Sequence, residues 1–125
     1  MARHAVTTDK IAKPAGPFSP AIRAGDTLYL SGQVAQDPAT GRLIAGDVAA
    51  QTERIFRNIE AVLHAATLSL DHVIKVNVYL TDMKDYAAMN EVYARQFSAP
   101  HPARTTVAVA ALPLGGLVEI EVLAR

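Results

Sequence analysis

The sequence predicts an α+β subunit in which two helices lie on one face of a mixed sheet, in the order β-β-α-β-α-β-β. Short runs of strand-forming residues are bounded by glycine, proline and aspartate, as strands and their turns are. Two longer segments repeat apolar residues at steps of three and four, as amphipathic helices do. The chain has 125 residues, the size of one domain, and no repeat or low-complexity tract divides it.

The first 20 residues are expected to contain no helix. Residues 1–13 are polar and are predicted to be loosely held, apart from a short strand near residues 5–8. Three prolines and a glycine follow within residues 14–20. Because proline fixes φ and removes an N–H donor, this segment is predicted to be stiff and irregular. Its one aromatic side chain, Phe18, is expected to line a groove.

A hairpin and a long helix are predicted next. Residues 21–24 and 27–32 form the two strands of the hairpin, joined by the turn-forming pair Gly25-Asp26. Asp47 is the expected N-cap of a helix over residues 48 to about 66. Its apolar stripe is predicted to face the core and comprises Val48, Ile55, Ile59, Val62, Leu63 and Ala66.

The second half of the chain is predicted to hold three strands and one helix. A strand covers residues 73–80 and a helix covers about 84–97, with Asp82 or Asp85 as its cap. Two strand-like runs then flank a proline and glycine break at residues 113–116. The residues predicted to share one face of the first strand are Ile74, Val76, Val78 and Leu80. The residues predicted to pack from the helix onto the sheet are Tyr86, Met89, Tyr93 and Phe97.

Composition excludes several classes of function. The formal net charge is +0, and the 12 Lys and Arg residues are scattered rather than grouped as a nucleic-acid footprint would require. With 0 cysteines the chain can form no disulfide, thiol nucleophile or thiolate metal site. No apolar stretch approaches the ~20 residues of a membrane span, and residues 1–14 lack a signal-peptide core, so a cytoplasmic protein is expected. Charged residues make up 19%, below the ~25% of an average soluble domain, which suggests that other subunits cover part of the surface.

Common catalytic motifs are missing as well. The histidines at positions 4, 64, 72 and 101 have no metal-ligand spacing, and no G-x-S-x-G elbow occurs. Gly115-Gly116 lacks the lysine and hydroxyl residue of a phosphate loop. No metal or cofactor is therefore expected. What remains is a cleft built from arginine, glutamate, backbone groups and small polar side chains.

Three charged residues lie inside the last two predicted strands. Arg104 follows Pro102-Ala103, and Glu119 and Glu121 alternate with apolar neighbours. A buried charge without a partner costs several kcal/mol, so such groups meet an opposite charge, a ligand or water. The fork of donors on an arginine suits a bidentate carboxylate. Two interpretations stay open here, a ligand site and the rim of a half-solvated sheet.

Four blocks in order give the chain a resemblance to a known family. They are Gly-Pro-Phe-Ser-Pro-Ala at 16–21, Leu-Ser-Gly-Gln at 30–33, Tyr-Ala-Ala-Met-Asn-Glu-Val-Tyr at 86–93, and Pro-Ala-Arg-Thr-Thr-Val at 102–107 with Val-Glu-Ile-Glu at 118–121. The sequence resembles the RidA (YjgF) family of reactive-intermediate imine deaminases over about residues 14–124. The resemblance implies a chorismate-mutase-like subunit and a homotrimer with a barrel-like core and clefts between subunits.

The resemblance also implies a reaction. Enamine and imine carboxylates of the 2-aminoacrylate type would be hydrolysed to 2-keto acids and ammonia without a cofactor. Arg104 matches the arginine that grips the substrate carboxylate, and Glu119 matches the glutamate that orients or activates water. Thr106 stands where many members have a cysteine whose backbone carbonyl helps to hold the water, so regulation by thiol oxidation is excluded. A neighbouring arginine is expected to keep Glu119 ionised near neutral pH.

The remaining implied site residues bind substrate. Ser31 and Gly32 match the wall of the cleft, and Asn90 matches an asparagine near the pocket. Phe18 stands where the deaminases usually have a tyrosine, so one polar contact is lost and substrate choice shifts toward more apolar imines. Plain packing for Phe18 and a surface or interface position for Asn90 stay open as alternatives.

Two other functions fit the same resemblance. One is a trimer that binds small ligands, or acts as a chaperone-like or regulatory protein, without turnover. The other is a pathway-specific deaminase that acts on one enamine of the aminomuconate type. The ribonuclease activity described for some relatives is disfavoured, because the sequence has no basic stripe.

Overall fold

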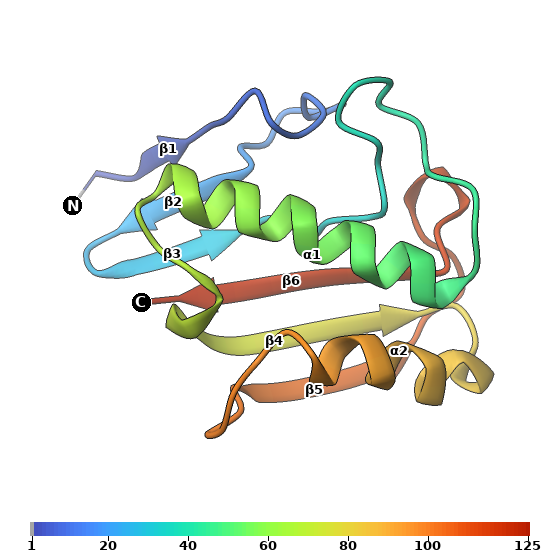
Figure 1. The fold of residues 1–125 in the computed structure, drawn as a ribbon. Coiled ribbons are helices and arrows are strands. Elements are labelled where there is room, and N and C mark those ends of the chain that lie inside the picture. Colours follow the sequence, from blue (N-terminus) through green and yellow to red (C-terminus); the bar gives the residue numbers. More distant parts are fainter. Residues whose placement is uncertain (1) are drawn as a thin grey trace.

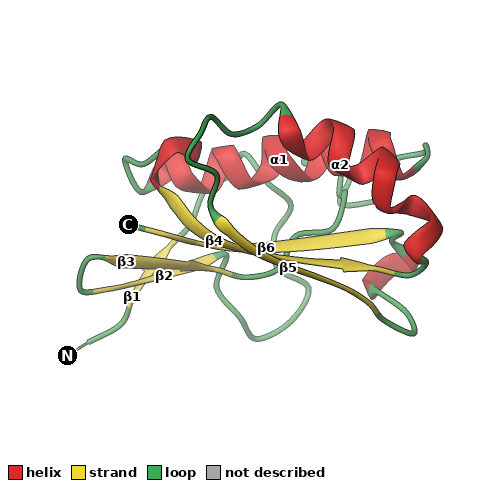
Figure 2. Cartoon of the chain, turned by 90° about the horizontal axis from the view of Figure 1, so that it is seen from below, coloured by secondary structure: helices red, strands yellow, loops and turns green. Residues whose placement is uncertain are grey.

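The computed structural model describes residues 2–125 and confirms the predicted architecture (Figure 1). The described residues form the strands β1 (His4–Val6), β2 (Ala21–Ala24), β3 (Thr27–Leu30), β4 (Val73–Leu80), β5 (Ala103–Ala108) and β6 (Val118–Ala124). The helices are α1 (Val48–Ala65) and α2 (Tyr86–Ala94), with short 3-10 turns at Leu70–His72, Met83–Asp85 and Pro113–Gly115. Both helices lie on one face of the sheet, as Figure 2 shows.

The strands form one mixed sheet in the order β1-β2-β3-β6-β4-β5. Within the described residues β4 and β5 pair in parallel, and the other neighbouring strands pair antiparallel. The predicted hairpin is β2–β3, and Gly25 in its turn has a φ of 58°, a conformation that favours glycine. β1 lies slightly earlier than the strand expected at residues 5–8 and pairs with β2. Met1, part of the segment expected to be loosely held, lies outside the described residues.

Helix α1 begins at the predicted residue, and Asp47 is its N-cap. The Asp47 backbone is extended, and its Oδ1 accepts a hydrogen bond of 3.0 Å from the Ala50 N–H. This contact satisfies one of the N–H groups that a helix start leaves without a partner. The predicted stripe faces the sheet, and its members Ile55, Ile59, Val62 and Leu63 are completely buried. At the junction with α2, the Phe56 ring meets the edges of Tyr93 and Phe97 at centroid distances of 5.8 and 5.7 Å.

Replacing Asp47 with alanine is expected to lower the free energy of unfolding by about 1 kcal/mol, because the Ala50 N–H loses its acceptor. Asp47→Asn keeps an acceptor oxygen and should stay close to the parent. Asp9→Ala, an exposed change far from any helix start, is the matched control. Urea titrations give the midpoints, and equal values for Asp47→Ala and Asp9→Ala would contradict the capping role.

Helix α2 is shorter than predicted at both ends. The residues before Tyr86 form a separate 3-10 turn, and Asp82 caps that turn by accepting from the Lys84 N–H at 2.9 Å. Asp85 precedes α2 but makes no side-chain cap. At the other end, the Gln96 side chain donates to the Val92 carbonyl at 2.9 Å and satisfies it after the helix has ended. The prediction of one continuous helix over 84–97 was therefore wrong.

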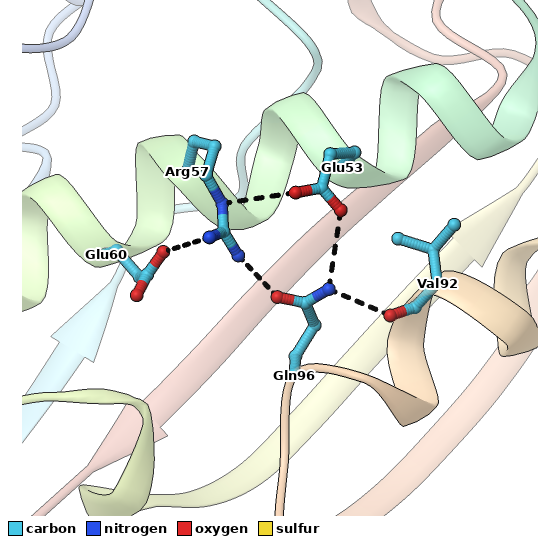
Figure 3. Close-up of polar contacts among 5 residues, drawn as sticks. All are labelled: Glu53, Arg57, Glu60, Val92 and Gln96. Carbon is cyan, nitrogen blue, oxygen red and sulfur yellow. Dashed lines mark hydrogen bonds and ion pairs between the residues drawn. The ribbon is translucent and has the colours of Figure 1, made fainter.

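A polar cluster ties α1 to the end of α2 (Figure 3). Arg57 of α1 pairs with Glu60 at 2.7 Å and with Glu53 at 3.6 Å, and it donates to the side-chain oxygen of Gln96. Gln96 in turn donates toward Glu53 and to the carbonyl of Val92. Partly exposed ion pairs contribute little stability, and the contacts of this cluster between the two helices are those of Gln96 with Arg57 and Glu53.

One residue of β4 departs from the predicted alternation. Val76, Val78 and Leu80 are buried as expected, whereas Ile74 is 48% exposed. The pairing of β4 with β6 shifts register between Val73 and Lys75, as at a β-bulge, and this shift turns Ile74 away from the core. Ile74 therefore lies outside the core, next to the buried Val73 at the start of β4.

Candidate functional site

The structure separates the predicted site residues into two groups. The first group lines a cavity of about 570 Å³ on the sheet face away from the helices, here called the glutamate cavity. Its lining includes Phe18, Ser31, Gly32, Glu119 and Glu121. The second group surrounds Arg104 on the helix side of the sheet. It is called the arginine cluster and comprises Arg104, Tyr86, Asn90 and Tyr93.

Gly32 lines the glutamate cavity directly beside the Glu119 carboxylate. A Cβ atom on Gly32 would lie 2.3 Å from Glu119 Oε2 and 2.9 Å from its carboxyl carbon, so the carboxylate occupies space that only glycine leaves open. Ser31 Oγ donates to the Ser19 carbonyl at 2.6 Å and attaches the proline-rich segment to the end of β3. Phe18 lies on that segment and is 53% exposed, so its ring lines the cavity rather than the core.

Burial raises the pKa of Glu119, and the charge of Glu121 raises it further. Both carboxylates project from β6 toward the same face, because Val118, Ile120 and Val122 fill the alternate positions under the helices. Within one chain no arginine acts on Glu119, so the expectation that a neighbouring arginine keeps it ionised stays a prediction for an assembly of several copies. Arg104 points to the opposite face, and the pKa of Glu119 moves up instead of down.

Glu121 is fixed by two donors from β4. Tyr79 Oη donates to Glu121 Oε1 at 2.5 Å, and Asn77 Nδ2 donates to the same oxygen at 3.1 Å. The hydrogen bond to Glu121 is the main cause that raises the pKa of Tyr79 to about 12. Tyr79 therefore remains a protonated donor at neutral pH, and Glu121 is held in place beside Glu119.

Arg104 is anchored by α2. Its Nη1 donates to Asn90 Oδ1 at 2.7 Å, and its Nη2 donates to Tyr86 Oη at 2.9 Å. The guanidinium carbon lies 4.6 Å from the centroid of the Tyr93 ring, within cation–π range. Within residues 2–125 no carboxylate forms an ion pair with Arg104. Neutral groups thus orient the guanidinium, and its positive charge is available to an anionic ligand.

The sequence-based prediction placed neither tyrosine of this cluster in the site, and Tyr86 departs from it more than the buried Tyr93 does. Tyr86 was assigned to packing, yet it is 37% exposed and its hydroxyl meets Arg104. The available signal was its spacing, since Tyr86 and Asn90 are four residues apart on one helical face. A hydrogen bond from Asn90 and the charge of Arg104 lower the pKa of Tyr86, whereas burial raises the pKa of Tyr93.

Two hydroxyl groups near Arg104 have no partner among the described residues. Thr106 lies two residues further along β5, so it faces α2 as Arg104 does. Among residues 2–125 neither Thr106 Oγ1 nor Tyr93 Oη makes a hydrogen bond, although both atoms are buried. Buried polar atoms are nearly always satisfied in folded proteins, so the region under α2 suits a water molecule or polar ligand.

One chain does not bring Arg104 and Glu119 together. Arg104 stands beside Val76, which is buried under the helices, whereas Glu119 stands beside Tyr79 on the open face. Because successive side chains in a strand point to opposite faces, the two groups lie on opposite sides of the sheet. β5 is also an edge strand, and its Thr105 is exposed.

Two further features bear on the class of site. In the part of the chain that the structure describes, no group of three or more His, Asp or Glu side chains could hold a metal ion. No helix of residues 2–125 has the length and hydropathy needed to span a bilayer.

Comparison with known proteins places the chain in a family. Residues 8–125 match the family described as Endoribonuclease L-PSP. A RutC family protein of Pyrococcus horikoshii is 48% identical over 122 residues, which cover 98% of this chain and 97% of that protein. The 2-iminobutanoate/2-iminopropanoate deaminase of Capra hircus is 40% identical, with 99% and 90% of the two chains covered. The crystal structure of RidA from an Antarctic Psychrobacter superimposes with a TM-score of 0.94 at 47% identity, covering 98% of each chain. The chain therefore belongs to the Endoribonuclease L-PSP family, the family of the RidA proteins.

Proposed function

We propose that this protein hydrolyses enamine and imine carboxylates of the 2-aminoacrylate type to 2-keto acids and ammonia. The observation that carries the proposal is the guanidinium of Arg104, which neutral partners orient and no carboxylate of residues 2–125 neutralises. A small anionic substrate supplies the missing charge. The names of relatives at about 40% identity support the same class of reaction.

The chemistry needs little beyond placement. The enamine tautomerises to an imine, whose carbon is already electrophilic. Arg104 holds the carboxylate, and Glu119 takes a proton from water as the water oxygen bonds to the imine carbon. The C=N electron pair moves to nitrogen, which gains that proton and gives a carbinolamine. Glu119 then takes the hydroxyl proton and returns it to the amino group, so the oxygen pair forms the C=O bond while the C–N bond breaks and ammonia leaves. A raised pKa brings Glu119 closer to the operating pH, where a group that accepts and returns a proton works best.

The proposal requires two copies of the chain at each site. Arg104 and Glu119 lie on opposite faces of one sheet, so a substrate that contacts both must lie between the arginine cluster of one copy and the glutamate cavity of the next. The exposed β5 edge and the uncovered open face offer the surfaces for this contact. A closed homotrimer uses each surface once per subunit and leaves neither unpaired.

The test supplies 2-aminoacrylate from a pyridoxal-phosphate dehydratase and follows loss of the imine signal with and without the protein. Light scattering on the same sample gives the oligomeric state. Acceleration by a trimer supports the proposal, and a monomer or an unchanged rate for several side chains rejects it. A keto acid that binds without any imine being consumed would identify a ligand-binding protein instead. Rates across several enamines, including an aminomuconate, separate a general enzyme from a pathway-specific one.

The acid limb of the activity profile is expected to move to lower pH in Glu121→Gln. The negative charge of Glu121 raises the pKa of Glu119, so a neutral glutamine lowers it and leaves Glu119 ionised at more acid pH. Glutamine keeps an oxygen that can accept from Tyr79 and Asn77. Profiles of kcat/KM against pH measure the shift, with Asp26→Asn, a change at the β2–β3 turn, as the control. A limb that stays in place or moves up would refute the coupling.

A further inference from the structure

The hydroxyl of Tyr86 has no role in the core. Tyr86 is the first residue of α2, its side chain is 37% exposed, and the buried residues of this helix are Met89, Val92 and Tyr93. Its Oη lies 2.9 Å from Arg104 Nη2, on a different element of the fold. Packing alone would be served equally well by phenylalanine, so the position of the hydroxyl calls for a separate explanation.

The hydrogen bonds of Tyr86 Oη show whether its hydroxyl hydrogen already has an acceptor in the protein. An arginine can only donate, so Tyr86 Oη is the acceptor in its contact with Arg104. A phenol oxygen that accepts still carries its own hydrogen, and no atom of residues 2–125 accepts a hydrogen bond from it. Asn90 Oδ1 accepts from Arg104 Nη1, and the influence of Asn90 that lowers the pKa of Tyr86 is that of a donor, so it does not use the phenol hydrogen.

The donors that Arg104 and Tyr86 leave without a partner indicate which kind of ligand they can bind. Of the five N–H donors of Arg104, two are used by Asn90 and Tyr86, which leaves three for a ligand. The Tyr86 hydroxyl adds one more donor beside them. Donors grouped around one positive charge favour an acceptor that carries negative charge, and a carboxylate has this chemistry.

We propose that Tyr86 is a ligand-binding residue whose hydroxyl donates a second hydrogen bond to the carboxylate that Arg104 holds. This inference rests on the proposed function for the identity of that carboxylate. It makes Tyr86 a determinant of specificity for anionic over neutral ligands. Phe18, on the wall of the glutamate cavity, offers no such donor, so the phenol of this site comes from α2.

The test compares binding of 2-oxobutanoate and its neutral amide to the parent and to Tyr86→Phe by calorimetry. Loss of one hydrogen bond to a charged group at a partly exposed position is expected to raise the Kd for the acid about 10-fold, with little change for the amide. In turnover the same variant should raise KM while kcat stays within about 2-fold of the parent. Tyr29→Phe, an exposed tyrosine on β3, is the matched control.

Each outcome decides the inference. An unchanged Kd for the acid, or equal losses for the acid and the amide, overturns the role of the hydroxyl, since a structural disturbance would not distinguish the two ligands. Should the parent bind the acid but consume no imine, the proposed function fails while the Kd ratio still judges Tyr86. A parent that does not bind the acid overturns both.

Discussion

Replacing Arg104 with alanine is expected to lower kcat/KM for imine carboxylates by about 100-fold or more, while the fold remains intact. A bidentate contact with a carboxylate contains two charge-assisted hydrogen bonds of about 1.5–3 kcal/mol each, and about 1.4 kcal/mol corresponds to a factor of ten. Arg104 lies on the edge strand β5 and contributes no side chain to the apolar core, so truncation should spare stability. Initial rates, together with circular dichroism and light scattering, measure both effects.

Two further variants sharpen this result. Arg104→Lys keeps the charge but loses the planar fork, and it should recover only part of the activity. Arg95→Ala removes an exposed arginine just after α2, whose Nε contacts only the Glu91 carbonyl, and it should behave as the parent does. Equal rates for Arg104→Ala and Arg95→Ala would rule out a carboxylate anchor at Arg104.

The elements with local signals were predictable from the sequence. Asp47 has a short acceptor side chain before a periodic apolar stripe, so the start of α1 could be placed to the residue. Gly25-Asp26 between two strand-like runs located the hairpin for the same reason. The errors occurred where a non-local contact decides. Just past the end of α2, Gln96 accepts from Arg57 of α1, and the exposure of Ile74 depends on a register shift against β6.

The site was less predictable because it depends on which face each strand turns toward the helices. Along β6 the apolar residues face the helices, and Glu119, which alternates with them as the sequence indicated, lies on the open face. Along β5 the rule that apolar residues face the helices and polar residues face outward does not hold. Val107 is 42% exposed while the more polar Arg104 lies under α2, because α2 offers it Asn90 and an aromatic ring. The pattern of residues along β5 cannot predict that the neighbouring helix α2 places Asn90 and Tyr93 beside Arg104.

Glu119→Gln is expected to lower kcat by about 10²–10⁴-fold, the range that a positioned general base contributes. Glutamine has nearly the same shape and still fits against Gly32, but it cannot take a proton from water. Gly32→Ala should lower kcat as well, because its Cβ would lie 2.3 Å from Glu119 Oε2 and must displace the carboxylate. Gly41→Ala adds a Cβ with nothing within 4 Å but strains a φ of 73°, so it is the control for a glycine substitution that costs stability and leaves the Glu119 carboxylate in place.

The same Glu119→Gln change should increase stability at neutral pH, and this opposite sign separates a catalytic role from a structural one. The pKa of Glu119 is raised in the folded chain, mainly by burial. The stability that it contributes is therefore fully present below its unfolded pKa and is lost as the pH rises through the folded pKa. At pH 7 the ionised carboxylate opposes folding, and a neutral amide removes that cost. Thermal unfolding at pH 7 and pH 4 measures the difference, which should shrink at pH 4. A variant that loses both activity and Tm at pH 7 would show that Glu119 supports the fold instead of acting on water.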